Sequence, residues 1–280
     1  MTSFRIATIN TAKGDGPYLE RLDALLAGLS DLDLDIIALQ EVLLSEDGRL
    51  DTARVLARGL GMACAYVPAR WKRRVVQGRT VATWSGLALL SRLPIADVAT
   101  RPLPSTDRDG ERRVLLTRVS QGGVCLRIAN THLTHLRDAQ QVRRVQLTAV
   151  LAESWWHGPA SIRLLCGDLN AGPASDELIA VRERSQGWHV VDAYSAGGGM
   201  PRSSVRIPVT ASPGEFRIDH IWSLAPSENA HPAFSEARVA LTEPAANGVL
   251  PSDHLAVAVT VQAPVTVLGP APATQRRAGD

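Results

Sequence analysis

The sequence lacks several features that would assign it to a specialised class of protein. Its three cysteines, Cys64, Cys125 and Cys166, form no CxxC pair. Each lies in an apolar stretch, which predicts buried, reduced thiols and no disulfide framework. No apolar run approaches the roughly 20 residues of a membrane span, and no basic and apolar leader precedes the first strand-like segment. We therefore expect a cytoplasmic protein.

The chain also has little net charge. Its formal charge is +2 over 280 residues, so the overall charge does not by itself indicate a nucleic-acid partner. One local basic cluster contains Arg70, Lys72, Arg73, Arg74 and Arg79. A solvated loop explains the cluster on charge alone, and recognition of a polyanionic substrate is the alternative.

Length and composition indicate a globular protein with a sizeable core. Hydrophobic residues make up 45% of the chain and charged residues 21%, which argues against disorder. Residues 195–214 are rich in Gly, Ser and Pro and predict a long loop, whereas the Pro- and Ala-rich residues 263–280 predict a flexible tail. We expect one domain over 1–262, with a division near 195–214 as the weaker alternative.

Hydrophobic patterns predict more strands than helices. Strands are expected at 4–10, 35–40, 62–67, 86–91, 112–119, 124–130, 162–166, 188–192, 216–224, 237–241 and 255–261. Helices are expected near 19–29, 51–60, 138–153 and 174–182. Because the helices recur between pairs of strands, the order favours two sheets packed face to face with helices outside.

Polar side chains stand at or near the ends of these strands. They are Asn10, Glu41, His132, Asp168, Asn170, Asp219, Asp253 and His254. Taken singly, each is explained by a turn or a cap, and the stretch LLCGDLNAGP (164–173) is rich in turn formers. Taken together, they supply oxygen ligands, imidazoles and amides where layered α/β proteins bind their ligands.

The residue types indicate which metal would suit the site. Glu41, Asp253 and the Asn10 carbonyl are hard oxygen donors that suit Mg²⁺ or Mn²⁺, whereas no cysteine cluster or HExxH helix supports zinc. The motifs GxSxG and GxxxxGK[ST] are missing too, which leaves serine hydrolases and P-loop NTPases unsupported. His135 follows His132 by three residues, so in a strand the two side chains point to opposite faces. We therefore expect His135 at the surface or behind the site.

Hydrolysis of a phosphate ester needs such a set of groups. A cation must neutralise the substrate, a base must activate water, and fixed donors must meet the charge on the phosphoryl oxygens. Asp168 can act as the base, with Asn170 on the same side. His132 and His254 can donate to the phosphoryl oxygens. Asp219 can hold the His254 imidazole in its tautomer and orientation.

Seven stretches carry a resemblance that covers residues 4–261. They are, in order, ATINTAKG, IIALQEV, SGLALLSRLPI, IANTHL, LLCGDLNAGP, FRIDHIW and PSDHLAV. In this order the chain resembles the endonuclease/exonuclease/phosphatase superfamily of metal-dependent phosphoesterases. The resemblance implies an α/β fold, a four-layer αββα sandwich of two packed mixed β-sheets flanked by helices. Ile9 stands where the family often has Trp, and we expect only a packing change there.

The resemblance also implies a metal-binding side. Glu41 matches the main ligand, Asn10 lies beside it, and Asp253 matches the second acidic position near the metal. The implied cofactor is Mg²⁺ or Mn²⁺.

The catalytic side is implied in the same way. Asp168 and Asn170 match the base and the phosphate-orienting residue, and His132 matches the phosphate-facing position. Asp219 and His254 match the family's Asp-His dyad.

The expected function is hydrolysis of phosphate esters by metal- and Asp-activated water, on diesters in the manner of a nuclease rather than on monoesters. The alternatives are a soluble phosphomonoesterase of the inositol- or sugar-phosphate type, and a catalytically silent member that binds nucleic acid or protein. A closed pocket would favour monoesters, and Arg202 and Arg206 could supply the closure. We expect a monomer whose partner is a phosphate-ester substrate, with nucleic acid among the candidates.

Overall fold

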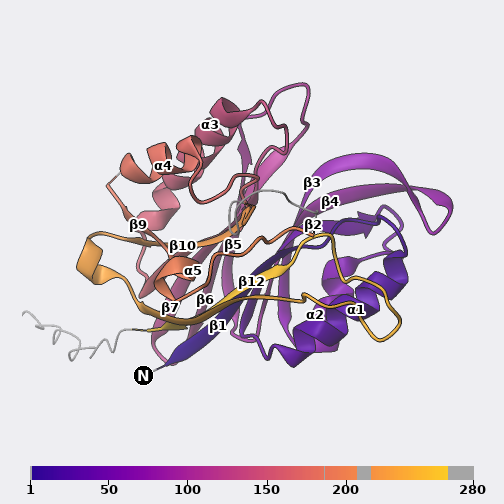
Figure 1. Ribbon diagram of the computed structural model, residues 1–280, viewed down its shortest axis with the longest axis horizontal. Coiled ribbons are helices and arrows are strands. Elements are labelled where there is room, and N and C mark those ends of the chain that lie inside the picture. The colour runs from indigo at the N-terminus through magenta and orange to yellow at the C-terminus, as the bar shows by residue number, and fades with distance from the viewer. Residues whose placement is uncertain (1, 186, 207–215, 264–280) are drawn as a thin grey trace, which may run out of the picture.

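The computed structural model describes residues 2–185, 187–206 and 216–263 of the chain (Figure 1). The first of two six-stranded sheets contains β1 (Ser3–Asn10), β2 (Ile36–Ser45), β3 (Ala63–Val76), β4 (Arg79–Ser91), β11 (Ala233–Ala240) and β12 (Ala256–Gln262). Its strand order is β11-β12-β1-β2-β4-β3. Only β1 and β2 run parallel in this sheet.

The second sheet contains β5 (Ile95–Leu103), β6 (Arg112–Gln121), β7 (Val124–His132), β8 (Ile162–Asp168), β9 (His189–Asp192) and β10 (Asp219–Ala225). Its strand order is β5-β6-β7-β8-β10-β9. The single parallel pair here is β7 with β8. Both sheets are therefore mixed.

Helices cover the outer faces of the two sheets. They are α1 (Tyr18–Asp31), α2 (Thr52–Leu60), α3 (Gln140–Leu151) and α4 (Asp176–Glu183). The short α5 (Ala193–Ala196) instead contacts strands of both sheets, and 3₁₀ turns lie at Ser154–His157 and Glu228–Ala230. In Figure 1, α1 and α2 lie on one side of the molecule and α3 and α4 on the other. None of the helices within the described ranges is long and apolar enough to span a membrane.

Three apolar clusters hold these layers together. One lies between the sheets and joins Ile6 and Ile36 of the first sheet to Ile128 and Leu164 of the second. A second cluster packs the first sheet against α1 and α2, and a third packs the second sheet against α3 and α4. The alternation of inward and outward side chains along each strand produces this arrangement. The expected α/β, four-layer αββα sandwich is confirmed.

The basic cluster at 70–79 does not lie in a loop, contrary to the simplest interpretation of its charge. β3 and β4 extend much further than expected and pair from Ala63 opposite Ser91 to Val76 opposite Arg79, with one register shift between Pro68 and Arg70. The connection is Gln77-Gly78, with φ of 50° and 71°, as a tight hairpin turn requires. β-Branched residues on both sides of this turn favour strand. Arg70, Lys72, Arg73 and Arg74 thus lie on β3, an edge strand of the first sheet, and Arg79 begins β4.

The prediction that every cysteine is buried was wrong. Cys166 is buried between the sheets, but Cys64 is exposed and Cys125 is half-buried; all three are free thiols. Cys64 lies near the start of β3, an edge strand with one side open to solvent. The strand β5 was not predicted, because most of its side chains are exposed and give no apolar run. The predicted tail lies outside the described residues from 264 onward, as does 207–215 of the predicted loop region.

A buried polar bridge joins the two sheets next to their ends. Asn130 of β7 donates from Nδ2 to the carbonyl oxygens of Leu39 and Ala88, both at 2.9 Å. Its Oδ1 accepts from Gln40 Nε2 at 2.7 Å. These groups are fully enclosed, so each depends on the others for its hydrogen bonds.

We expect Asn130→Ala to lower the free energy of unfolding by about 2–4 kcal/mol, because it leaves two buried carbonyls unpaired. Denaturant titration would measure this change. Asn229→Ala, at an exposed position, is the matched control and should stay within about 0.5 kcal/mol of the parent. Equal stability of the two variants would contradict a structural role for the bridge.

Candidate active site

Strand register aligns three of the predicted residues in one row. His132 of β7 pairs with Asp168 of β8, and Asp168 pairs with Asp219 of β10. Gly167 permits this alignment, because a Cβ there would lie 2.1 Å from the Thr131 carbonyl oxygen. Residues far apart in the sequence thus meet at one end of the second sheet.

The Asp168 carboxylate is buried and receives hydrogen bonds from both sheets. Its Oδ2 accepts from Asn10 Nδ2 of β1 at 3.0 Å, and its Oδ1 accepts from the Asn170 backbone N–H at 2.9 Å. Asn170 has φ of 51°, a conformation that Asn tolerates, and its Nδ2 donates to the Leu133 carbonyl at 3.0 Å. Asp168 and Asn170 therefore form a turn and line the site at the same time.

Two imidazoles flank this carboxylate. Asp168 Oδ2 lies 3.5 Å from His132 Nε2 and 3.8 Å from His254 Nε2. His254 Nδ1 donates to Asp219 Oδ2 at 2.8 Å, and Ser204 Oγ donates to the same oxygen at 2.7 Å. The other Asp219 oxygen is buried without a partner among the described residues. Asp219 thus lies behind His254 and fixes its orientation.

The enclosure of the site shifts its pKa values in different directions. Burial, followed by the negative charge of Asp219, raises the pKa of Asp168 to about 7. Burial lowers the pKa of His254, but the charge and hydrogen bond of Asp219 outweigh it and raise that pKa to about 10. Burial, followed by the charge of Arg112, lowers the pKa of His132 well below its ordinary value. Near neutrality His254 is therefore protonated and His132 is neutral.

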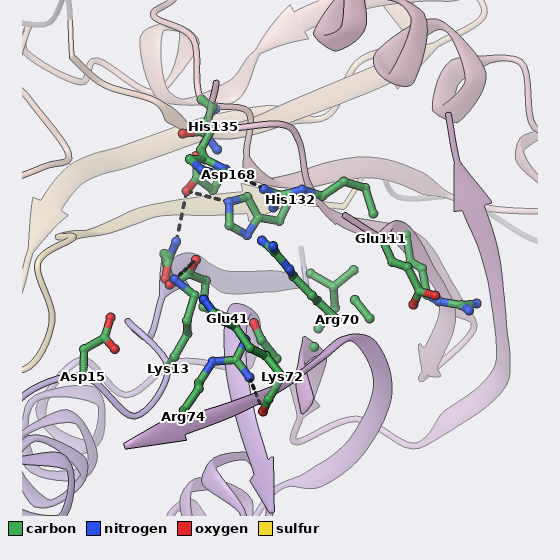
Figure 2. Close-up of a pocket in the computed structure, with 18 of the residues that line it drawn as sticks. Lys13, Asp15, Glu41, Arg70, Lys72, Arg74, Glu111, His132, His135 and Asp168 are labelled. Atoms are coloured by element: carbon green, nitrogen blue, oxygen red, sulfur yellow. Dashed lines mark hydrogen bonds and ion pairs between the residues drawn. The ribbon is translucent and has the colours of Figure 1, made fainter. Parts of the chain in front are cut away.

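Glu41 lies across the cleft from this group. It occupies an irregularity in the β2–β4 register, with φ of 54°. Its Oε1 is 2.6 Å from Lys13 Nζ, and Figure 2 shows the two side chains together at the cleft. Nearby, Ser252 Oγ donates to the Asn10 carbonyl at 2.7 Å and lies 3.2 Å from Asp253 Oδ1. Carboxylates and a carbonyl thus gather on this side.

A single cleft of about 620 Å³ connects both groups. It is lined by seven of the eight predicted residues, namely Asn10, Glu41, His132, Asp168, Asn170, Asp253 and His254. Asp219, the eighth, lies behind His254. The cleft is also lined by His135, which was expected at the surface or behind the site.

The donors present suit a divalent cation. Asp168, Asp219 and His254 each offer a ligand atom within 4.8 Å of the others, so this group could hold a metal ion. Glu41 and Asp253 form a second set of hard oxygen donors in the same cleft. The ammonium group of Lys13 against Glu41 shows that this carboxylate already accommodates a positive charge.

Several cleft residues were not predicted from the sequence. Lys13 was missed because only the fold brings it to Glu41. Arg21 of α1 is buried and donates to the carbonyls of Asp15, Ala12 and Lys13, which fixes the loop that carries Lys13. An arginine within an apolar helix pattern was the only available signal for it.

Arg206, one of the two arginines considered for closure of the pocket, has structural partners. Arg206 donates to the carbonyls of Ser252 and Thr242 at 2.9 and 2.7 Å. It therefore secures the segment before Asp253 and does not reach over the cleft. Arg217, two residues before Asp219, pairs with Asp192.

Comparison with known proteins agrees with this geometry. The chain matches the model of the Endonuclease/Exonuclease/phosphatase family over residues 7–260. It belongs to this family. Members hydrolyse phosphate esters, and this chain is accordingly a hydrolase of that class, with phosphoesterase, nuclease-like chemistry. A search of curated protein sequences found no match.

Solved structures of family members share the fold. A Bacteroides vulgatus endonuclease/exonuclease/phosphatase is 18% identical with a TM-score of 0.70, covering 94% of this chain and 100% of that one. A humanized D. rerio TDP2 is 20% identical with a TM-score of 0.69, covering 93% and 99%. The human Nocturnin catalytic domain, with bound sulfate anion, is 21% identical with a TM-score of 0.68, covering 94% and 95%.

The Asp219 contact predicts an unusual titration of His254. NMR should place the His254 pKa near 10 in the parent protein and several units lower in Asp219→Asn. Because the folded-state pKa is raised, the contact adds stability that is full below pH 6.5, the ordinary value, and is lost as the pH rises through about 10. The variant should lack this pH-dependent stability.

Asp138→Asn is the control for this titration, because Asp138 is exposed and pairs with Arg108 at the surface. It should leave the His254 titration unchanged. A His254 pKa near 6.5 in the parent protein would contradict the assignment of the dyad.

Proposed function

We propose that this protein is a divalent-metal-dependent phosphodiesterase, with Asp168 as the base that activates water. The observation that carries the proposal is the buried Asp168 carboxylate, which lies between two imidazoles and is fixed by Asn10 and Asn170. Its raised pKa suits a base that must accept a proton near neutral pH. No serine or cysteine nucleophile is needed for this chemistry.

The two histidines would then act on the phosphoryl oxygens. His254, which Asp219 keeps protonated, can donate from Nε2 to an oxygen that gains negative charge in the transition state. Neutral His132 can donate a hydrogen bond from the other side of Asp168. Asn170 keeps one amide hydrogen and its carbonyl oxygen available toward the cleft.

Mg²⁺ or Mn²⁺ would be held by Glu41 and Asp253, with Asn10 contributing to the same side. The alternative set of Asp168, Asp219 and His254 is less suitable, because protonated His254 cannot ligate a metal. When bound, the ion would neutralise substrate charge and polarise the phosphoryl group. Metal binding at Glu41 requires the Lys13 ammonium to move away from Oε1.

The cationic side chains beyond the site support a phosphodiester substrate of the nucleic-acid type. Arg70, Lys72, Arg73 and Arg74 line the cleft along β3, and four steps of extended strand cover about 13 Å. A row of this length exceeds one phosphate group and suits a chain of phosphates. The sulfate anion bound to the similar Nocturnin domain also supports binding of tetrahedral anions in this fold.

The same cations favour a second candidate, a phosphomonoesterase, because a terminal phosphate has more negative charge than a diester.

We also propose the domain organisation and the cellular location of the protein. Residues 1–262 would form one monomeric domain. The free cysteines fit the reducing cytoplasm.

Hydrolysis should depend on Asp168. We expect the parent protein with Mg²⁺ or Mn²⁺ to cleave bis-p-nitrophenyl phosphate or plasmid DNA, and EDTA to abolish cleavage. Asp168→Asn should lower kcat by about 10²-fold or more, since it removes the base. p-Nitrophenyl phosphate, tested in parallel, would reveal a monoesterase.

Asp138→Asn is the surface control and should retain full activity. If the parent protein and Asp168→Asn prove equally inert on all three substrates, the hydrolytic proposal fails in favour of a silent binding protein.

Metal binding should depend on Glu41. Calorimetric titration with Mn²⁺ should give at least about 10-fold weaker binding for Glu41→Gln, because a carboxylate ligand is lost. Glu46→Gln, an exposed carboxylate just after β2, should bind like the parent protein. Unchanged binding in Glu41→Gln together with lost binding in Asp219→Asn would instead assign the metal to the second donor set.

A further inference from the structure

The loop between β5 and β6 holds an arginine at the cleft. Asp109 of this loop has a fully buried side chain, and its carboxylate accepts from Arg112 Nε at 3.0 Å and Nη2 at 2.8 Å. His135 Nδ1 lies 3.1 Å from the same carboxylate. Arg112 is thus held in a two-point contact at the start of β6, next to the catalytic histidines.

The neighbouring residue of the loop accommodates a second arginine from the opposite sheet. Gly110 has φ of 86°, and a Cβ on it would lie 2.9 Å from Arg70 Nε. The Arg70 guanidinium therefore rests against the bare backbone of Gly110. In Figure 2 the Arg70 side chain points into the cleft toward His132.

Both guanidinium groups keep unused donors. Arg70 has no hydrogen bond or ion pair within the described ranges, and Arg112 Nη1 has none there either. Arg112 lines the same cleft as His132 and Asp168, which places it at the candidate active site. Arg70 from the first sheet and Arg112 from the second line the same cleft, and Asp109 occupies only Nε and Nη2 of Arg112.

We propose that Arg70 and Arg112 bind the non-bridging oxygens of the phosphoryl group under attack, and that the Asp109-Gly110 turn positions both arginines. The inference rests on the proposed function, because the ligand is the substrate's phosphate. Planar guanidinium groups match the geometry of phosphate oxygens better than ammonium groups do. Arg70 and Arg112 are then substrate-contacting residues, and Asp109 is a positioning residue.

An ion pair between the same loop and the segment before α3 provides a contrast. Arg108 contacts Asp138 at 3.0 Å, but 66% of each side chain is exposed. Solvent screens such a pair, so it has little effect on binding or stability. The pair of Asp109 and Arg112 is instead largely buried, is joined by two hydrogen bonds, and lies at the cleft.

Binding of inorganic phosphate to the full chain tests the proposal without turnover. We would titrate phosphate by calorimetry in EDTA, which removes the metal contribution. Arg70→Met and Arg112→Met should each weaken phosphate binding by about 10-fold or more. Arg79→Met, at the far end of the same hairpin, and Arg108→Met should bind within about twofold of the parent protein.

Asp109→Asn tests positioning. It should weaken phosphate binding and raise KM more than Arg108→Met does, with thermal melting as the check on folding. Because Arg70 is exposed, Arg70→Met keeps the test valid even if Asp109→Asn fails to fold.

The proposal is overturned if Arg70→Met and Arg112→Met bind phosphate like the controls, or if the parent protein binds none. Failure of the proposed function is a separate result. In that case no ester is hydrolysed, while phosphate binding still requires both arginines.

Discussion

The site depends on burial of the Asp168 carboxylate. A buried carboxylate is costly unless hydrogen bonds and charges compensate it, and here the compensating groups come from both sheets. Asn10 reaches it from the first sheet and His254 from the segment before β12, while Asn170 and His132 belong to the second sheet or its turns. The two sheets must therefore end in alignment. The Asn130 bridge and the apolar layer between the sheets maintain that alignment.

Charge is divided across the cleft in a way that follows from this arrangement. Glu41 and Asp253 lie on one side with Lys13, whereas the arginines lie along β3 and, beside Glu111, at the start of β6. The only two lysines of the chain, Lys13 and Lys72, both line the cleft. In the proposed mechanism, an anionic ester would meet a metal on one side and guanidinium groups on the other, with the base between them.

Much of the site could be predicted from sequence because its residues follow apolar strands directly. Asp168 and His132 come at strand ends, and parallel pairing of β7 with β8 sets them side by side. Contacts made by long side chains gave no such signal. Lys13 meets Glu41, and Arg70 meets Gly110, only after the hairpin and loops have folded. Charge alone favoured a solvated loop at 70–79, but the Gln77-Gly78 turn and the β-branched residues beside it favour a hairpin.

The most direct test of the account is the pH dependence of kcat/KM for hydrolysis of a phosphodiester. A base with the environment of Asp168 predicts an acidic limb, in which activity rises with pH as the carboxylate loses its proton. Its midpoint should lie well above the ordinary value of 3.8, near 7. Activity that stays constant down to pH 5 would show that the catalytic base titrates as an ordinary carboxylate, and would contradict the central place of the buried Asp168.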